Sequence, residues 1–165
     1  MAFRLSKCAL LFSVGLFYLL VVFNNLTDYN SNYQFVHHVL MMDSTFPGNS
    51  GMWRAINGTF VHHAFFDSII VWEILTTALC LCGVIALMRN LRSSAVAFNQ
   101  AKRLGIAALT LSLLMWLVAF LSVGAEWFLM WQSRTWNGQE AAGRMFEVIG
   151  IILIYLSMPE SETQA

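Results

Sequence analysis

Four long blocks of apolar residues, separated by polar segments, dominate the hydrophobic pattern of the chain. The blocks cover residues 8–26, 64–88, 104–131 and 145–158. A helix needs about 20 mostly apolar residues to cross ~30 Å of hydrocarbon, and continuous blocks lack the alternation of a barrel strand. The pattern therefore predicts an all-α, polytopic membrane protein: a four-helix transmembrane bundle forming a single membrane domain over residues 1–165.

The polar segment over residues 27–63 has a helical pattern of its own. Its apolar residues recur at the spacing of one helix face: Phe35, Val36, Val39 and Leu40. This spacing predicts an interfacial helix over residues 32–42. The turn-forming residues Asn57 and Gly58 then precede a helix that leads into the second block. The bundle is thus expected to carry a helical outer-side loop.

The basic residues predict the orientation of the bundle. They cluster before the first block and between the second and third: Arg4, Lys7, Arg89, Arg92, Lys102 and Arg103. The positive-inside rule places these segments, and with them both termini, in the cytoplasm. Tryptophans favour the membrane interface, and four of them gather at the opposite end: Trp53, Trp127, Trp131 and Trp136.

The first block begins like a secretory signal peptide, because Arg4 and Lys7 precede it. Residues 24–29 lack the small residues that a signal peptidase requires. We therefore expect a retained helix rather than a cleaved peptide.

Composition and charge narrow the class of protein further. Of 165 residues, 58% are apolar and only 11% are charged, against roughly 25% charged in an average soluble domain. Nine basic and nine acidic side chains cancel, so no basic field indicates nucleic acid. These values exclude a soluble enzyme, and they leave the lipid bilayer as the first expected partner.

Ionisable residues inside the predicted spans are the candidates for chemistry. Glu73 is expected roughly 12–15 Å below the outer membrane surface and Glu126 about 9 Å below it. A carboxylate in hydrocarbon costs a few kcal/mol, so each should face the bundle interior and have a partner. The candidate polar cluster comprises His62, Asp67, Glu73, Glu126, Glu147, Arg144 and Asn24.

Helical phase groups small and polar residues into one stripe per helix. On the first helix the stripe is Ser13, Phe17, Leu20 and Asn24. On the second it is His62, Phe66, Ile69, Glu73, Thr76 and Cys80. On the third it is Ala108, Ser112, Met115, Ala119, Ser122 and Glu126, and on the fourth Gly143, Glu147, Gly150 and Ile154. Small residues let membrane helices approach closely, so all four stripes are expected to face inward.

Two interpretations of the polar cluster remain open. In the first, His62, Glu73 and Glu126 belong to a membrane-embedded metal, haem or proton site, since imidazole and carboxylate suit several transition metals. In the second, the carboxylates form a structural network with neighbouring donors. The sequence contains no metal-ligand motif and no signature of a known catalyst, and His62 and Glu73 are separated by about 16 Å of helix. The structural interpretation is favoured, with no cofactor and no enzymatic activity expected.

Several segments resemble a family of bacterial predicted small integral membrane proteins. They are residues 25–32, 35–40, 42–45 and 53–56 in the outer loop, and the more distinctive blocks 126–133 and 136–139. The resemblance spans nearly the whole chain. It implies four transmembrane helices, a bacterial inner membrane and a domain of unknown function, and it brings no established activity or catalytic residue.

The fourth block predicts a partner in the membrane. Only residues 148–158 of it are free of charge, which is short for a lone span, and such mismatch is often relieved by packing against another subunit. Residues 132–144 offer a docking edge, with Trp131, Trp136 and Asn137 as interface candidates. The sequence thus favours a non-catalytic accessory or assembling subunit of a membrane complex, bound to another membrane subunit or to itself.

Overall fold

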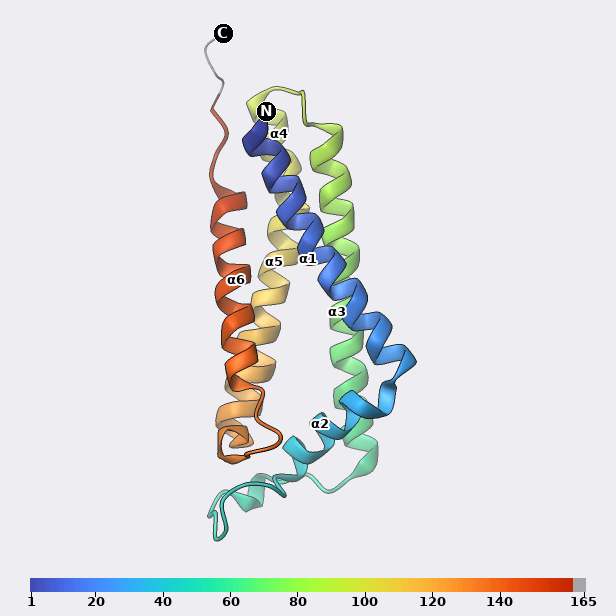
Figure 1. The fold of residues 1–165 in the computed structure, drawn as a ribbon, viewed down its shortest axis with the longest axis vertical. Helices are drawn as coiled ribbons and strands as arrows, with labels where there is room; N and C mark the ends of the chain where they lie inside the picture. The colour runs from blue at the N-terminus through green and yellow to red at the C-terminus, as the bar shows by residue number, and fades with distance from the viewer. Residues whose placement is uncertain (162–165) are drawn as a thin grey trace.

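Four long helices run side by side along the molecule (Figure 1). They are α1 (Ala2–Thr27), α3 (Thr59–Arg89), α5 (Arg103–Leu114) continued by the π-helical η2 (Met115–Trp127), and α6 (Gln139–Ser157). Shorter elements connect them: α2 (Tyr29–Met41), η1 (Met52–Arg54), α4 (Ala95–Ala101) and η3 (Met130–Gln132). The computed structural model describes residues 1–161, and this part of the chain contains no strand. The prediction of an all-α membrane protein is confirmed.

Three helical stretches are long and apolar enough to cross a membrane: Ala2–Thr27, Thr59–Arg89 and Ala95–Trp127. The 19 residues of α6 extend about 28 Å, which is also close to the thickness of the hydrocarbon. The first half of α6 is more polar than the three stretches named above, because it contains Gln139, Glu140, Arg144 and Glu147.

Three helix boundaries differ clearly from the sequence prediction. The first long helix begins at Ala2, six residues before the predicted residue 8. The third long helix ends at Trp127 instead of residue 131, because Leu129 adopts a left-handed conformation with φ 54° and turns the chain. The fourth begins at Gln139, six residues earlier than expected, because its polar first turns are helical too. Glu126 therefore lies at the end of its helix, whereas Glu147 lies near the middle of α6.

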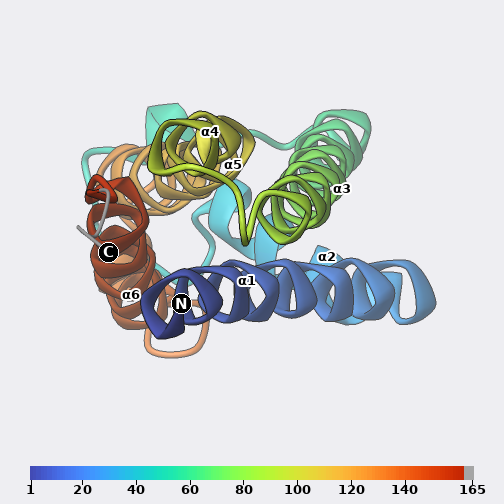
Figure 2. The same cartoon turned by 90° about the horizontal axis from the view of Figure 1, so that it is seen from above.

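Viewed along the bundle, each long helix packs on two neighbours, in the order α1, α3, α5 and α6, with α6 returning to α1 (Figure 2). The closest approach joins α3 to α5, where a Cβ on Gly83 would lie 2.9 Å from the backbone nitrogen of Gly105. The main apolar core surrounds this contact and includes Leu11, Tyr18, Cys80, Leu87, Phe98, Leu109 and Leu156. The half of the bundle that holds the chain ends is thus tightly packed.

The opposite half of the bundle is open, because α1 and α3 diverge from η2 and α6 (Figure 1). Helix α2 crosses this gap. Tyr33 of α2 packs with Phe66 and Ile70 of α3, and its last turn packs on the segment that follows η2. The helix predicted over residues 32–42 is present as α2, which begins three residues earlier. It connects the pair α1 and α3 with the pair η2 and α6.

The π-helical winding of η2 changes which residues face the core. A π-helix closes i→i+5 hydrogen bonds, as in the bond from the Phe128 amide to the Val123 carbonyl, 3.0 Å. The predicted stripe is buried as far as Met115, but Ser122 and Glu126 are exposed, and Gly124 and Ala125 are buried instead. The inward orientation expected for Glu126 was therefore wrong. The prediction assumed the rotation of about 100° per residue of a regular α-helix, and this rotation does not continue beyond Met115.

The stripes on α1 and α6 also differ from the prediction. On α1 the buried face carries Leu11, Val14, Tyr18, Val22 and Asn25, whereas Ser13, Leu20 and Asn24 are exposed. On α6 the buried face carries Ala142, Ile149 and Leu156, whereas Glu147 and Ile154 are exposed. In both helices the buried residues recur at a spacing of seven, at Leu11, Tyr18 and Asn25 on α1 and at Ala142, Ile149 and Leu156 on α6.

Candidate functional site

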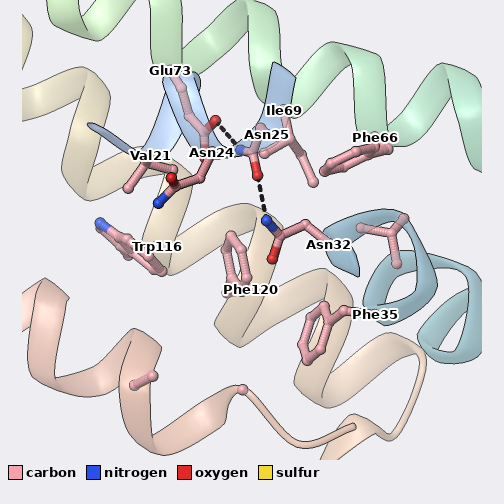
Figure 3. Close-up of a pocket in the computed structure, with 13 residues that line it drawn as sticks. Val21, Asn24, Asn25, Asn32, Phe35, Phe66, Ile69, Glu73, Trp116 and Phe120 are labelled. Carbon is pink, nitrogen blue, oxygen red and sulfur yellow. Dashed lines mark hydrogen bonds between the residues drawn. The ribbon is translucent and has the colours of Figure 1, made fainter. Parts of the chain in front are cut away.

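A cavity of about 390 Å³ lies in the open half of the bundle, beneath α2 (Figure 3). Its walls come from α1, α2, α3 and η2, with the start of α6 closing one side. Most of the lining is aromatic or aliphatic, including Phe35, Phe66, Trp116 and Phe120. The polar lining is a group of one carboxylate and three amides: Glu73, Asn24, Asn25 and Asn32.

A directional chain of hydrogen bonds ends at Glu73. The Asn32 Nδ2 of α2 donates to Asn25 Oδ1 at 2.7 Å, and the Asn25 Nδ2 of α1 donates to Glu73 Oε2 at 2.6 Å. Glu73 is 5% exposed and Asn25 4%. The chain joins α1, α2 and α3 at a single point, and both of its links direct N–H groups toward the carboxylate.

Glu73 has no cationic partner among residues 1–161, because the ion pairs there involve other carboxylates. Its position on the buried stripe of α3 agrees with the sequence prediction, as do those of His62, Phe66, Thr76 and Cys80. The sequence offered Asn25 only as one of several possible donors to the buried carboxylates, and the candidate cluster contained its neighbour Asn24. The spacing of seven from Leu11 to Tyr18 to Asn25 was the available signal for the buried face of α1.

A second cavity of about 240 Å³ adjoins the first and is almost wholly apolar. The two share Phe35, Val36, Ile69 and Phe120, and the second continues between α3 and η2 past Trp72. The result is an apolar slot with a polar pocket at one end.

A buried polar group borders the cavity on the side away from α2. Trp116 Nε1 donates to the Tyr18 hydroxyl at 2.9 Å, and this hydroxyl lies 2.6 Å from Ser112 Oγ. These three residues satisfy one another and close the floor beneath Glu73. Sequence reasoning found Ser112 on the inward stripe but did not connect it with Tyr18 or Trp116.

His62 is fully buried and pairs with His37 of α2. The two Nδ1 atoms are 2.8 Å apart, and His62 Nε2 lies 2.7 Å from the Ile56 carbonyl. Because a carbonyl only accepts, His62 carries its proton on Nε2 when neutral, and His37 donates from Nδ1. Burial, with the neighbouring His62 and His38, lowers the pKa of His37 below 6.5. Both nitrogens of His62 are thus used within the fold.

His63 and Asp67 meet through Tyr29 rather than directly. The Tyr29 hydroxyl donates to Asp67 Oδ1 at 2.9 Å and lies 2.9 Å from His63 Nδ1. Burial and the hydrogen bond to Asp67 raise the pKa of Tyr29 to about 12. This contact fixes the first turn of α2 on α3, and it keeps Asp67 on the exposed side of the helix.

The other cluster candidates lie apart from Glu73. Glu126 and Glu147 are exposed, on η2 and α6, and Arg144 pairs with Glu140 at 2.8 Å on the exposed start of α6. Asn24 is largely exposed but its side chain lines the cavity. The structure thus places Glu73 and Asn24 together and separates them from the remaining carboxylates.

No three His, Cys, Asp or Glu side chains gather closely enough to hold a metal ion within residues 1–161. His62, Glu73 and Glu126 in particular occupy three different places: the α2 contact, the cavity and the exposed end of η2.

All three interface candidates make contacts within the chain. The Trp136 ring stacks on His38 at 4.6 Å between centroids, and Asn137 Oδ1 accepts a bond from the Gln139 amide at 3.0 Å. Trp136 therefore anchors α2 and Asn137 caps the start of α6. Trp131 is 43% exposed and touches Phe46.

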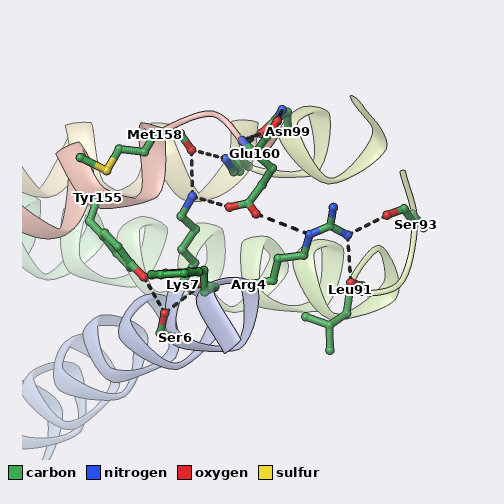
Figure 4. Close-up of polar contacts among 11 residues, drawn as sticks. Arg4, Ser6, Lys7, Leu91, Ser93, Asn99, Tyr155, Met158 and Glu160 are labelled. Carbon is green, nitrogen blue, oxygen red and sulfur yellow. Dashed lines mark hydrogen bonds and ion pairs between the residues drawn. The ribbon is translucent and has the colours of Figure 1, made fainter. Parts of the chain in front are cut away.

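A second polar network holds the two chain ends together (Figure 4). The buried Lys7 donates to the Met158 carbonyl at 2.8 Å and to Glu160 at 2.6 Å, and Lys102 donates to the same carbonyl at 2.6 Å. Arg4 reaches the carbonyls of Leu91 and Ser93, at 3.0 and 2.7 Å. In the sequence these basic residues predicted only the orientation of the bundle. In the structure Lys7, Lys102 and Arg4 also bond to carbonyls just beyond the ends of α6 and α3.

Comparison with known proteins places the chain in a family. Residues 3–159 match the family described as "Predicted small integral membrane protein (DUF2165)". No curated protein and no solved structure matches the chain. The helical architecture, with three stretches that can cross a membrane, agrees with this description. The chain belongs to the DUF2165 family of predicted small integral membrane proteins.

Proposed function

We propose that this protein is a non-catalytic accessory or assembling subunit of a membrane complex, and that it binds its partner through the outward face of α6. The observation that carries the proposal is the exposed carboxylate of Glu147 on a face of α6 that lacks bulk near its centre. Gly143 and Gly150 flank it, and a Cβ built at either position meets nothing within 4 Å.

The energetics of Glu147 favour a covered face. Counted from Gln139, Glu147 lies about 12 Å along α6, close to the midpoint of the helix. A carboxylate there costs a few kcal/mol when it faces lipid. Glu147 has no ion-pair partner in the described chain, so a donor from a second helix would remove this cost.

The glycines favour a helix as the occupant of this face. Small residues one and two turns apart allow two membrane helices to approach closely. Two copies related by a parallel two-fold axis would bring Glu147 against Glu147, which is repulsive when both are charged. We therefore propose a different membrane subunit, with a basic or hydrogen-bond-donating side chain opposite Glu147.

The same proposal includes a location and an orientation. The start of α1 and the end of α6 lie at the end of the bundle that carries Arg4, Lys7, Arg89, Arg92, Lys102 and Arg103 (Figure 1). The positive-inside rule makes that end cytoplasmic, and α6 becomes the fourth span. The resemblance of the chain to a family of bacterial membrane proteins supports a location in the bacterial inner membrane. The alternative of a metal or haem site has no structural observation in its favour.

Native mass measurement after extraction in a mild detergent tests the proposal. Wild-type protein is expected to carry a stoichiometric membrane partner, and Gly150→Trp is expected to lose it, because the indole would fill the space that the partner helix needs. Val71→Trp is the matched control. Val71 is 55% exposed on α3, away from α6, so this variant should keep the partner.

Two results would contradict the proposal. One is a wild-type monomer without a companion, and the other is a partner that survives in Gly150→Trp. If two differently tagged copies of the chain co-purify and Gly150→Trp abolishes this, the partner is a second copy of the chain and not a different subunit.

A further inference from the structure

We infer that the cavity beneath α2 binds an amphiphile with a primary ammonium head and an apolar chain, with Glu73 as the counter-ion. This inference goes beyond a docking role and rests on different residues. The shape of the site is its first support. A cavity of about 390 Å³ with a carboxylate continues into an apolar slot of about 240 Å³, which matches a polar head with an extended tail.

The charge of the site is the second support. Glu73 is 5% exposed and has no cation near it among residues 1–161. The chain from Asn32 through Asn25 delivers an N–H to its Oε2, so one carboxylate oxygen has a donor within the fold. No positive charge compensates this buried carboxylate among residues 1–161, and an ammonium head would supply one.

The geometry leaves room for that head. The hydrogen bond from Asn25 occupies Oε2, while no residue in the described chain donates to Oε1 of Glu73. Figure 3 shows Glu73 and Asn25 above the aromatic rings of Trp116 and Phe120. Aromatic faces attract ammonium groups, so the same walls that exclude water also favour a cation.

The position of α2 couples binding to the outer loop. Asn32 of α2 is the first link of the chain that ends at Glu73, and Phe35 of α2 lines both cavities. A ligand between α2 and η2 would therefore contact the helix that joins the two halves of the open end.

The probe for the test is a dodecylamine carrying a bromine atom, added to the full-length protein in phosphatidylcholine nanodiscs. Bromine quenches nearby indoles; Trp116 lines the first cavity and Trp72 the second. Wild-type protein is expected to show saturable quenching that disappears when both are replaced, in the double variant Trp116→Phe with Trp72→Phe. The brominated alcohol of the same length should bind more weakly, because it has no charge to pair with Glu73.

Paired carboxylate variants decide the role of Glu73. Glu73→Gln keeps the shape of the side chain and removes its charge, so the Kd for the amine should rise at least about tenfold while that for the alcohol stays unchanged. Glu126→Gln is the matched control, because Glu126 is exposed at the end of η2 and should leave both constants unchanged. Ile69 lines both cavities, so the larger side chain in Ile69→Phe would narrow the passage between them and should weaken the binding of both probes.

An amine that binds Glu73→Gln as tightly as wild type would overturn the inference, and so would saturable quenching that persists when Trp116 and Trp72 are both replaced by Phe. If Glu73→Gln does not fold, Ile69→Phe still decides, since unchanged amine binding there excludes the cavity. Nanodiscs with added phosphatidylethanolamine distinguish the source of the ammonium. Competition with the probe identifies the lipid head as the occupant, and its absence identifies a free amphiphilic amine.

Discussion

The contact between Gly83 and Gly105 makes a quantitative prediction about the packing of α3 on α5. In Gly83→Ala, the new Cβ would lie 2.9 Å from the Gly105 nitrogen and 3.1 Å from its Cα. Both are backbone atoms within helices, so neither can rotate away and the helices must separate. Overpacking of this kind costs about 1–3 kcal/mol.

A gain in helix propensity opposes this cost. Replacing glycine by alanine inside a helix stabilises it by about 0.5–1 kcal/mol. Gly83→Ala should therefore lower the free energy of unfolding by about 1 kcal/mol net, within a range of about 0–2.5 kcal/mol. Gly150→Ala gains the propensity without the clash, because nothing lies within 4 Å of its Cβ, and it should be neutral or slightly stabilising.

Unfolding of the purified protein in mixed micelles of increasing dodecyl sulfate content, followed by circular dichroism, measures both variants against the wild type. A difference of 1.4 kcal/mol appears as a tenfold change in the folding equilibrium constant. Equal shifts in Gly83→Ala and Gly150→Ala would refute the reasoning, since the two substitutions differ only in what surrounds the new methyl group.

Two predictions concern pH. The folded protein lowers the pKa of His37, so the docking of α2 should be strongest above pH 6.5 and be lost below it, as the pH falls through the lowered pKa of the folded state, with faster amide exchange over residues 29–41. The step should vanish in His37→Leu and persist in His38→Gln; a step that persists in His37→Leu would assign it to another group. Burial raises the pKa of Glu160, but the hydrogen bond and charge of Lys7, with other nearby cations, outweigh this and lower it below 4.5. Attachment of the segment after α6 should therefore be complete above pH 4.5 and be lost as the pH falls through the folded pKa, and Glu160→Gln should show the loss at neutral pH in a spin-label mobility measurement. A label that stays immobile in Glu160→Gln would show that the carbonyl contacts of Lys7 suffice.

The sequence predicted the helical architecture because apolar blocks of span length have few other stable forms in a membrane. It also placed Glu73 and His62 on the buried face of α3, since a regular α-helix keeps a constant phase over that length. The phase failed for Glu126, where the winding changes at Met115, and no residue pattern in the third block marks this change.

The faces of α1 and α6 were assigned wrongly for a different reason. Small and polar residues can line a contact between helices of the bundle or lie on its outer surface, and the residue types are the same in both cases. Glu147 illustrates this: it was expected inside the bundle, and it lies on the exposed face of α6. The hydrogen bond from Asn25 to Glu73 joins two residues that are 48 positions apart in the sequence. Whether two such residues meet depends on how each helix is rotated about its axis, which the residue types alone do not determine.

The unequal packing of the two ends gives the bundle the mechanics of a pair of levers. The chain ends are tied by Lys7 and Lys102, and the contact at Gly83 is a fixed fulcrum for α3. From Gly83 to Thr59 the helix extends about 36 Å, so a tilt of only about 3° at the fulcrum displaces its far end by about 2 Å. Small movements near Gly83 are therefore amplified at the open end, where α2 connects the two sides of the bundle and limits their separation.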